Sequence, residues 1–168
     1  MSRHYRRAGA LGAAVVAAVA FATPASAGPA QPADDPDFTL FAKEVTSDEG
    51  AEPQPTAPPA AGDTFSFASD LFRSKGGEKV GRDGVTCTVV RQTEQGGDIM
   101  CVGTFVLTGD PAGQITGQTL TAFSLTEEGP AEFEIAVTGG TGDFQDARGY
   151  INATEDGDHE RLDFHLTG

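Results

Sequence analysis

Basic residues are scarce in this 168-residue sequence, in which 11 lysines and arginines stand against 25 aspartates and glutamates, for a formal charge of −14. Three of the basic residues, Arg3, Arg6 and Arg7, lie within the first seven positions, so the rest of the chain is more acidic still. This negative balance argues against nucleic acid or an anionic membrane as a partner. It is instead typical of a protein that stays soluble outside the cell.

The sequence also lacks an apolar run long enough to cross a membrane, because the longest one covers only residues 11–21. That run follows the three arginines and precedes the small residues Ala25-Ser26-Ala27, a pattern typical of a cleaved signal peptide. We therefore predict a signal peptide over residues 1–27, a flexible leader over 28–37 and a secreted, extracellular protein. The arginine pair leaves the general secretory and twin-arginine routes both open.

Only two cysteines are present, Cys87 and Cys101. Export exposes them to oxidising conditions, and they lie on neighbouring segments that alternate apolar and polar residues. A structural disulfide is the favoured interpretation, and a catalytic thiol is the alternative. The absence of a Cys-x-x-Cys motif argues against a zinc or redox site, so we expect neither a metal nor a cofactor.

No amphipathic helix of useful length follows residue 38, and the chain from there is typical of strands and turns. A proline-rich stretch over residues 46–62 predicts a long loop. The predicted strands cover residues 38–45, 63–72, 85–93, 99–108, 114–123, 131–138, 148–155 and 161–167. Antiparallel strands in this number, joined mostly by short turns, favour a closed barrel because closure removes the sheet edges. The predicted fold is therefore all-β, a single eight-stranded antiparallel β-barrel domain over residues 38–168.

A glycine-dense stretch runs from Gly139 to Tyr150, with the sequence Gly-Gly-Thr-Gly-Asp-Phe-Gln-Asp-Ala-Arg-Gly-Tyr. No lysine follows these glycines, so the motif that cradles phosphate is absent. Glycines in this density let the backbone reach positive φ and approach a neighbouring segment closely. The stretch therefore predicts a tight irregular corner between two strands.

This stretch and several shorter elements resemble the superfamily of allene oxide cyclases and dirigent proteins, most of all its secreted bacterial members. The Gly139–Tyr150 stretch agrees with the dirigent motif at each specified position. Weaker similarities follow in the same order as in the family: Lys43-Glu44, Ser69-Asp70-Leu71, Gly81-Arg-Asp-Gly84 and the Phe105 to Gly113 region. Lys43 departs from the family histidine, the aspartate pair is reduced to Ser69-Asp70, and no counterpart of the allene oxide cyclase site is found.

The resemblance implies an eight-stranded barrel with a largely apolar lumen, often assembled as a trimer, and a ligand pocket with a few polar residues. In the family such pockets steer the coupling of phenoxy intermediates, close an oxylipin epoxide or cyclise polyketides. Carried over residue by residue, it predicts Arg148, Glu44 and Asp70 as catalytic residues. Tyr150 and Asn152 share a strand face with Arg148 and could form a polar patch with it inside the barrel, so we predict these two residues and Arg82 as ligand-binding residues.

Each of these predictions has a structural alternative. Arg148 would otherwise bind backbone carbonyls at the glycine corner, and the carboxylates would be rim groups paired with Arg82 or Arg91. Glu44 shares its strand face with apolar residues, so it needs a partner or a raised pKa. We interpret His159 and His165 as solvated, and the acidic hairpin of Asp156, Asp158 and Glu160 lacks the spacing of a known calcium motif.

These observations favour a barrel that binds a small apolar or aromatic molecule and guides its cyclisation or stereoselective coupling. As an enzyme it would be of the isomerase or cyclase type. A non-catalytic extracellular carrier or binding module on the same scaffold is the alternative, and a structural cell-surface protein is a third. A homotrimer or dimer is expected from the family, and neither nucleic acid nor membrane is expected as a partner.

Overall fold

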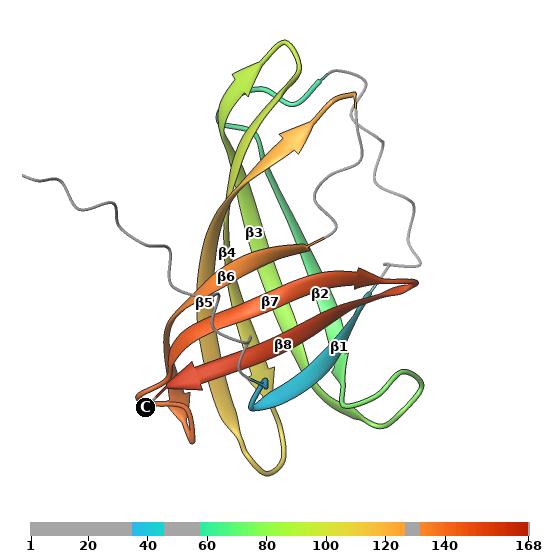
Figure 1. Ribbon diagram of the computed structural model, residues 1–168, viewed down its shortest axis with the longest axis vertical. Coiled ribbons are helices and arrows are strands. Elements are labelled where there is room, and N and C mark those ends of the chain that lie inside the picture. The colour runs from blue at the N-terminus through green and yellow to red at the C-terminus, as the bar shows by residue number, and fades with distance from the viewer. Residues whose placement is uncertain (1–34, 46–57, 127–131, 168) are drawn as a thin grey trace, which may run out of the picture. The chain divides into compact units, whose positions relative to one another are not determined.

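The computed structural model describes residues 35–45, 58–126 and 132–167, and its regular elements are all β-strands (Figure 1). They are β1 (Phe38–Glu44), β2 (Thr64–Phe72), β3 (Lys79–Thr93), β4 (Gly96–Leu107), β5 (Gly113–Ser124), β6 (Glu132–Gly142), β7 (Arg148–Asp156) and β8 (His159–Thr167). The predicted signal peptide, most of the leader and residues 46–57 of the proline-rich loop lie outside the described residues.

Each strand pairs antiparallel with the next in sequence, and β1 closes the ring by pairing with β8. In that closing pair Leu40 lies opposite Leu162, and Phe38 lies opposite Phe164. The predicted eight-stranded antiparallel barrel is confirmed. Within the described part of the chain, no helix has the length and hydrophobicity that a transmembrane segment requires.

One half of the barrel is filled by its own side chains, because apolar residues at alternate positions of each strand point inward. Phe164 stacks on Phe38 with ring centroids 4.5 Å apart and meets Phe105 edge-on at 5.5 Å. Phe144, from the β6–β7 connection, closes this end with its ring 6.2 Å from that of Phe38. The fully buried side chains here include Leu40, Leu71, Ile115, Ile151, Leu162 and Phe164.

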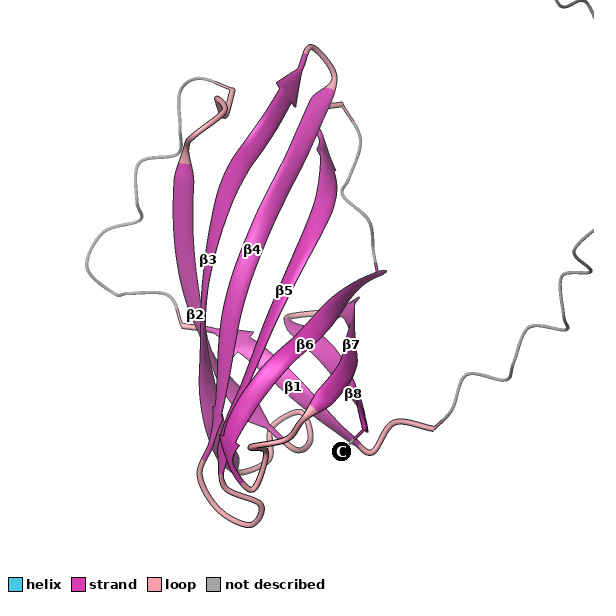
Figure 2. Ribbon diagram, turned by 90° about the vertical axis from the view of Figure 1, so that its left-hand side faces the viewer, coloured by secondary structure: helices cyan, strands magenta, loops and turns pink. Residues whose placement is uncertain are grey.

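The other half is less enclosed, because the strands differ in length. Strands β2 to β5 extend well beyond β1, β7 and β8, as Figure 2 shows. Pairing between β5 and β6 runs only from Gly113 to Gln118, although β5 continues to Ser124. Pairing between β1 and β2 likewise stops at Glu44 and Ser69. A four-stranded sheet therefore projects past the closed ring.

Three strand boundaries differ from the sequence prediction by three residues or more, and glycine is the reason in each case. Strand β3 begins at Lys79 and includes the Gly81-Arg-Asp-Gly84 element, and β4 begins at Gly96, three residues before the predicted start. Strand β6 continues to Gly142, so the glycine corner is mostly strand and the turn is confined to the residues after it. A Cβ on Gly140 would lie 2.5 Å from the Gln114 carbonyl oxygen. The glycine is therefore needed for close strand packing rather than for chain reversal.

The predicted disulfide between Cys87 and Cys101 is present. The two residues lie directly opposite each other on β3 and β4, with Cα atoms 4.1 Å apart. Cys87 is buried, at 1% exposure. The bond therefore ties together two long strands at the inner face of the projecting sheet.

Replacing both Cys87 and Cys101 with serine should lower the free energy of unfolding by about 2–3 kcal/mol, because the bond closes a loop of about 15 residues in the unfolded chain. Urea denaturation of the oxidised wild type, the reduced wild type and the double variant measures the difference. The reduced wild type should match the variant. Equal midpoints for all three proteins would contradict a stabilising role.

Candidate functional site

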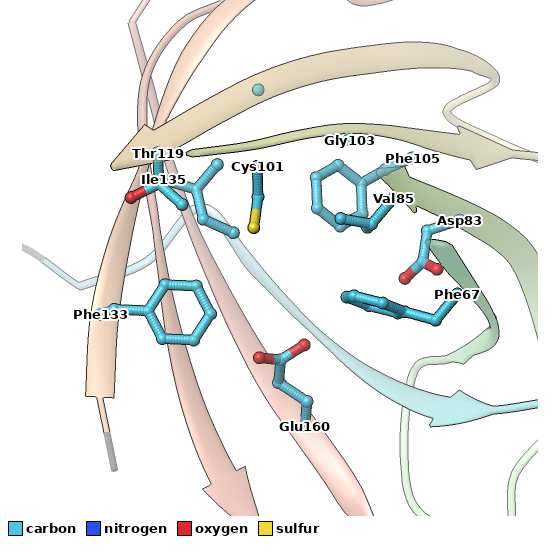
Figure 3. Close-up of a pocket in the computed structure, with 11 residues that line it drawn as sticks. Phe67, Asp83, Val85, Cys101, Gly103, Phe105, Thr119, Phe133, Ile135 and Glu160 are labelled. Atoms are coloured by element: carbon cyan, nitrogen blue, oxygen red, sulfur yellow. The ribbon is translucent and has the colours of Figure 1, made fainter. Parts of the chain in front are cut away.

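A cavity of about 60 Å³ lies where the filled half of the barrel meets the projecting sheet. Most of its wall is apolar, and two carboxylates, of Asp83 and Glu160, point into it from different strands (Figure 3). The lining residues are Phe67, Asp83, Val85, Cys101, Gly103, Phe105, Gly117, Thr119, Phe133, Ile135 and Glu160. The site therefore combines three aromatic rings with two acidic groups.

Asp83 is held in the cavity wall by β3, where it shares the inward face with Val85 and Cys87. It is 7% exposed, and the backbone N–H of Ser69 on β2 donates a hydrogen bond to its Oδ1 at 2.8 Å. Burial raises the pKa of Asp83 from 3.8 to about 6, although the hydrogen bonds from Ser69 act in the opposite direction. The desolvation of a carboxylate in an apolar wall therefore dominates here.

Glu160 enters the cavity from β8, on the same inward face as Leu162 and Phe164. Burial raises its pKa from 4.5 to about 7, and the negative charges of Asp83 and Glu155 raise it further. Within the described part of the chain, no hydrogen bond or ion pair joins its carboxylate to another residue. Glu160 is therefore close to half protonated at neutral pH.

A second, wider pocket of about 380 Å³ adjoins the cavity and forms its mouth. The two share Phe67 and Glu160. The mouth is lined by Ala42, Glu44, Phe67, Ser69, Glu155, Gly157, Asp158, His159 and Glu160. Together the two spaces fall in the size range of small-molecule sites in proteins.

Two carboxyl groups with separated, raised pKa values can act as an acid and a base on one molecule. Burial raises the pKa of both groups, that of Asp83 to about 6 and that of Glu160 to about 7, so the pair can hold one shared proton near neutral pH, with Glu160 the more readily protonated of the two. Such a pair can remove a proton at one atom of a bound molecule and return a proton at another. The net result is an isomerisation that needs no external reagent.

A family model described as the allene oxide cyclase barrel like domain matches residues 41–166. The chain belongs to this family. A solved structure named pyocyanin demethylase is similar, with a TM-score of 0.56 and 29% identity over 77% of this chain and 98% of that one. A pterocarpan synthase dirigent protein is similar in fold, with a TM-score of 0.51 and 20% identity over 77% of this chain and 84% of that one. No curated protein sequence gives a significant match.

Of the three residues that the sequence predicts as catalytic in this allene oxide cyclase-like barrel, only Glu44 lines the mouth, where it is exposed. Asp70 points outward and its Oδ1 lies 2.5 Å from the Lys79 Nζ. Arg148 is exposed, and its Nη1 donates to the backbone oxygen of Ala147 at 2.7 Å. That contact is the structural alternative considered for Arg148. The barrel does not bring these three side chains together.

The three predicted ligand-binding residues lie on the outer face of the barrel. Arg82 is exposed on β3, opposite Asp70 of β2. Tyr150 stacks on His165 with ring centroids 4.6 Å apart, and Asn152 lies opposite Asp163 of β8. None of them lines the cavity or its mouth. Their binding roles stay predictions without support from the cavity geometry.

Sequence reasoning did not select Asp83 and Glu160 as site residues, although a signal for both exists in the alternation of the strands. Asp83 lies two residues before Val85, and Glu160 lies two residues before Leu162, so each falls on an inward face. Glu160 was considered only as part of the acidic hairpin. Asp156 and Asp158 of that hairpin instead form ion pairs with Lys75 and Lys43.

Replacing Glu160 with glutamine should stabilise the barrel by about 1–3 kcal/mol at pH 8 and leave it unchanged or weaker at pH 4. The raised pKa means that the folded protein keeps a proton that the unfolded chain releases between pH 4.5 and about pH 7. The free energy of unfolding of the wild type therefore falls as the pH rises through this window. Glutamine carries no charge and removes the contribution of Glu160, whereas the raised pKa of Asp83 keeps its own contribution between pH 3.8 and about pH 6.

Thermal and urea denaturation from pH 4 to pH 8 measures the difference between the wild type and Glu160→Gln. Glu134→Gln is the matched control, because Glu134 is exposed and its position on β6 faces outward. A wild type whose stability rises between pH 5 and pH 8, or a control that behaves as Glu160→Gln does, would show that the buried charge is not the cause.

Proposed function

We propose that this barrel binds a small apolar or aromatic molecule in the cavity and isomerises or cyclises it by proton transfer. Asp83 and Glu160 are the acid–base pair. The observation that carries the proposal is that two carboxylates, one from β3 and one from β8, face one apolar cavity with raised pKa values. Such perturbed groups in a cleft are typical of catalytic sites.

The walls supply the second part of the chemistry. Phe67, Phe105 and Phe133 present ring surfaces to a bound molecule. These rings also limit the access of bulk water to the two carboxyl groups, so the pKa values of the carboxyl groups stay raised. A coupling of radical intermediates would require an oxidising partner, whereas a proton shift requires only groups already in the cavity.

The two similar structures support chemistry on a small molecule. One is named a demethylase of pyocyanin and the other a pterocarpan synthase, so barrels of this shape act on small organic compounds. We propose in addition that the protein works after export, since a disulfide persists in an oxidising compartment. The family also favours a homotrimer or dimer, whose barrels would each keep a separate cavity.

Filling the cavity should abolish the binding of a neutral aromatic probe such as N-phenyl-1-naphthylamine. Gly103 lines the cavity, and a Cβ built on it would lie 3.2 Å from the Val85 Cγ2, so Gly103→Leu places a side chain in the open space. Fluorescence titration should show that the dissociation constant of the probe is at least tenfold larger for Gly103→Leu than for the wild type.

Gly84→Leu is the matched control for the binding experiment. Gly84 lies beside Val85 on β3 but is exposed on the opposite face, and a Cβ there meets nothing within 4 Å. This variant should bind the probe as the wild type does. Equal binding by all three proteins would place the ligand site outside the cavity.

Glu160→Gln should lower the rate of conversion of the natural ligand by about 10²–10⁴-fold, because it removes one member of the proton-transfer pair. The wild-type rate should depend on pH as a bell whose limbs lie near 6 and 7. Mass spectrometry and chromatography of small molecules that co-purify with the protein would detect a product of unchanged mass.

Arg148→Ala separates this proposal from the sequence prediction, since Arg148 lies outside the cavity. It should retain the wild-type rate. If Arg148→Ala loses the activity and Glu160→Gln retains it, the acid–base pair is wrong. If no variant changes the ligand and the wild type binds it tightly, the protein is a carrier, the alternative function on this scaffold.

A further inference from the structure

The carboxylates that face the lumen at its open end lack basic partners. Glu44, Glu155 and Glu160 all line the mouth, and they come from β1, β7 and β8. Glu155 lies directly opposite Glu160 in the β7–β8 pair. Among the described residues, no hydrogen bond or ion pair compensates any of these three side chains. Asp83 adds a fourth carboxylate in the cavity behind them.

The lysines and arginines of the described chain do not pair with these three glutamates, and Lys43 is the one that pairs with another mouth residue, Asp158. Neither the cavity nor its mouth is lined by a lysine or an arginine. Five of them form ion pairs with aspartates: Lys43 with Asp158, Lys75 with Asp156, Lys79 with Asp70, Arg91 with Asp98 and Arg161 with Asp163. Arg73 and Arg148 donate to backbone oxygens, and Arg82 is exposed.

The one basic side chain in the mouth is that of His159, and it is already paired. Its Nδ1 lies 2.7 Å from the Asp158 Oδ1. The Nζ of Lys43 lies 3.0 Å from the other carboxylate oxygen of Asp158, Oδ2. Asp158 therefore forms an ion pair with Lys43 and a hydrogen bond with His159. Glu44 and Glu155, and Glu160 in its ionised form, have no such partner among the described residues.

Carboxylates without basic partners favour a ligand of one charge over ligands of the other. An anionic molecule would add repulsion at a site that is already partly desolvated, whereas a cation would relieve the repulsion between Glu155 and Glu160. The aromatic wall acts in the same direction, since a ring face attracts a positive charge. Phe67 is well placed for this contact because it lines both the cavity and its mouth.

We propose that the ligand of this barrel is a small aromatic molecule that carries a positively charged nitrogen, with its ring in the cavity and its charge at the mouth carboxylates. This substrate class rests on the proposed function, because it assumes that the cavity is the binding site. It excludes fatty acids and other carboxylates as ligands.

The test compares three probes that share a two-ring skeleton and differ in charge: 1-methylquinolinium, 1-methylnaphthalene and 1-naphthoate. Equilibrium dialysis at pH 8 and low ionic strength, with the chain from residue 28 onward, gives the three dissociation constants. We expect the cation to bind at least about tenfold more tightly than its neutral isostere, and the anion to bind most weakly. Added salt should reduce the difference.

Two double variants locate the source of the preference. Glu155→Gln with Glu160→Gln removes two mouth charges and should reduce the preference for the cation, measured as the ratio of its dissociation constant to that of 1-methylnaphthalene in the same variant, to within about threefold. Glu132→Gln with Glu134→Gln makes the same change in net charge at exposed, outward-facing positions of β6 and should keep the full preference. The comparison separates the mouth from the overall negative charge.

The outcomes distinguish this inference from the proposed function. Equal binding of the cation and the neutral probe, or a preference for the anion, overturns the cationic ligand class. If Gly103→Leu still abolishes binding in that case, the cavity remains the site. A preference that survives Glu155→Gln with Glu160→Gln overturns the role of the mouth carboxylates. Failure of all three probes to bind the wild type overturns both proposals for aromatic ligands.

Discussion

The pairing of the first strand with the last is the constraint on which the site depends. Strand β1 is only seven residues long, yet it brings Leu40 against Leu162 and Phe38 against Phe164 and so closes the wall. Without it, the inner faces of β2 and β8 would be open to water, and the carboxylates would return toward their ordinary pKa values. The raised pKa values of Asp83 and Glu160 are therefore a consequence of ring closure more than of any single contact.

Much of the fold follows from the sequence because inward and outward residues alternate so regularly. The apolar residues of β8 and β1 predict both strands and their faces, and the two cysteines on neighbouring strands predict their bond. Strand ends are less predictable where glycines occur. Gly-Gly pairs are typical of turns, but Gly140 lies within β6 because the neighbouring strand and Phe144 leave no room for a side chain.

The candidate site was harder to predict, since its two carboxylates sit just outside the strands predicted from the sequence, residues 85–93 and 161–167. Asp83 lies in a glycine-flanked element, and Glu160 lies beside two aspartates. The burial of each depends on a neighbouring strand, β2 beside Asp83 and, from the other end of the sequence, β1 beside Glu160. Arg148 stood out through its motif, whereas its actual contact is the carbonyl of its own neighbour, Ala147.

The filled half of the barrel has a kinetic consequence. The rings of Phe38, Phe105 and Phe164, with Phe144 behind them, leave no passage from one end of the cylinder to the other. A molecule that enters the cavity through its mouth must also leave through the mouth. If the cavity is the ligand site, as proposed, arrival and departure use the same opening, so one bound molecule has to leave before the next can enter.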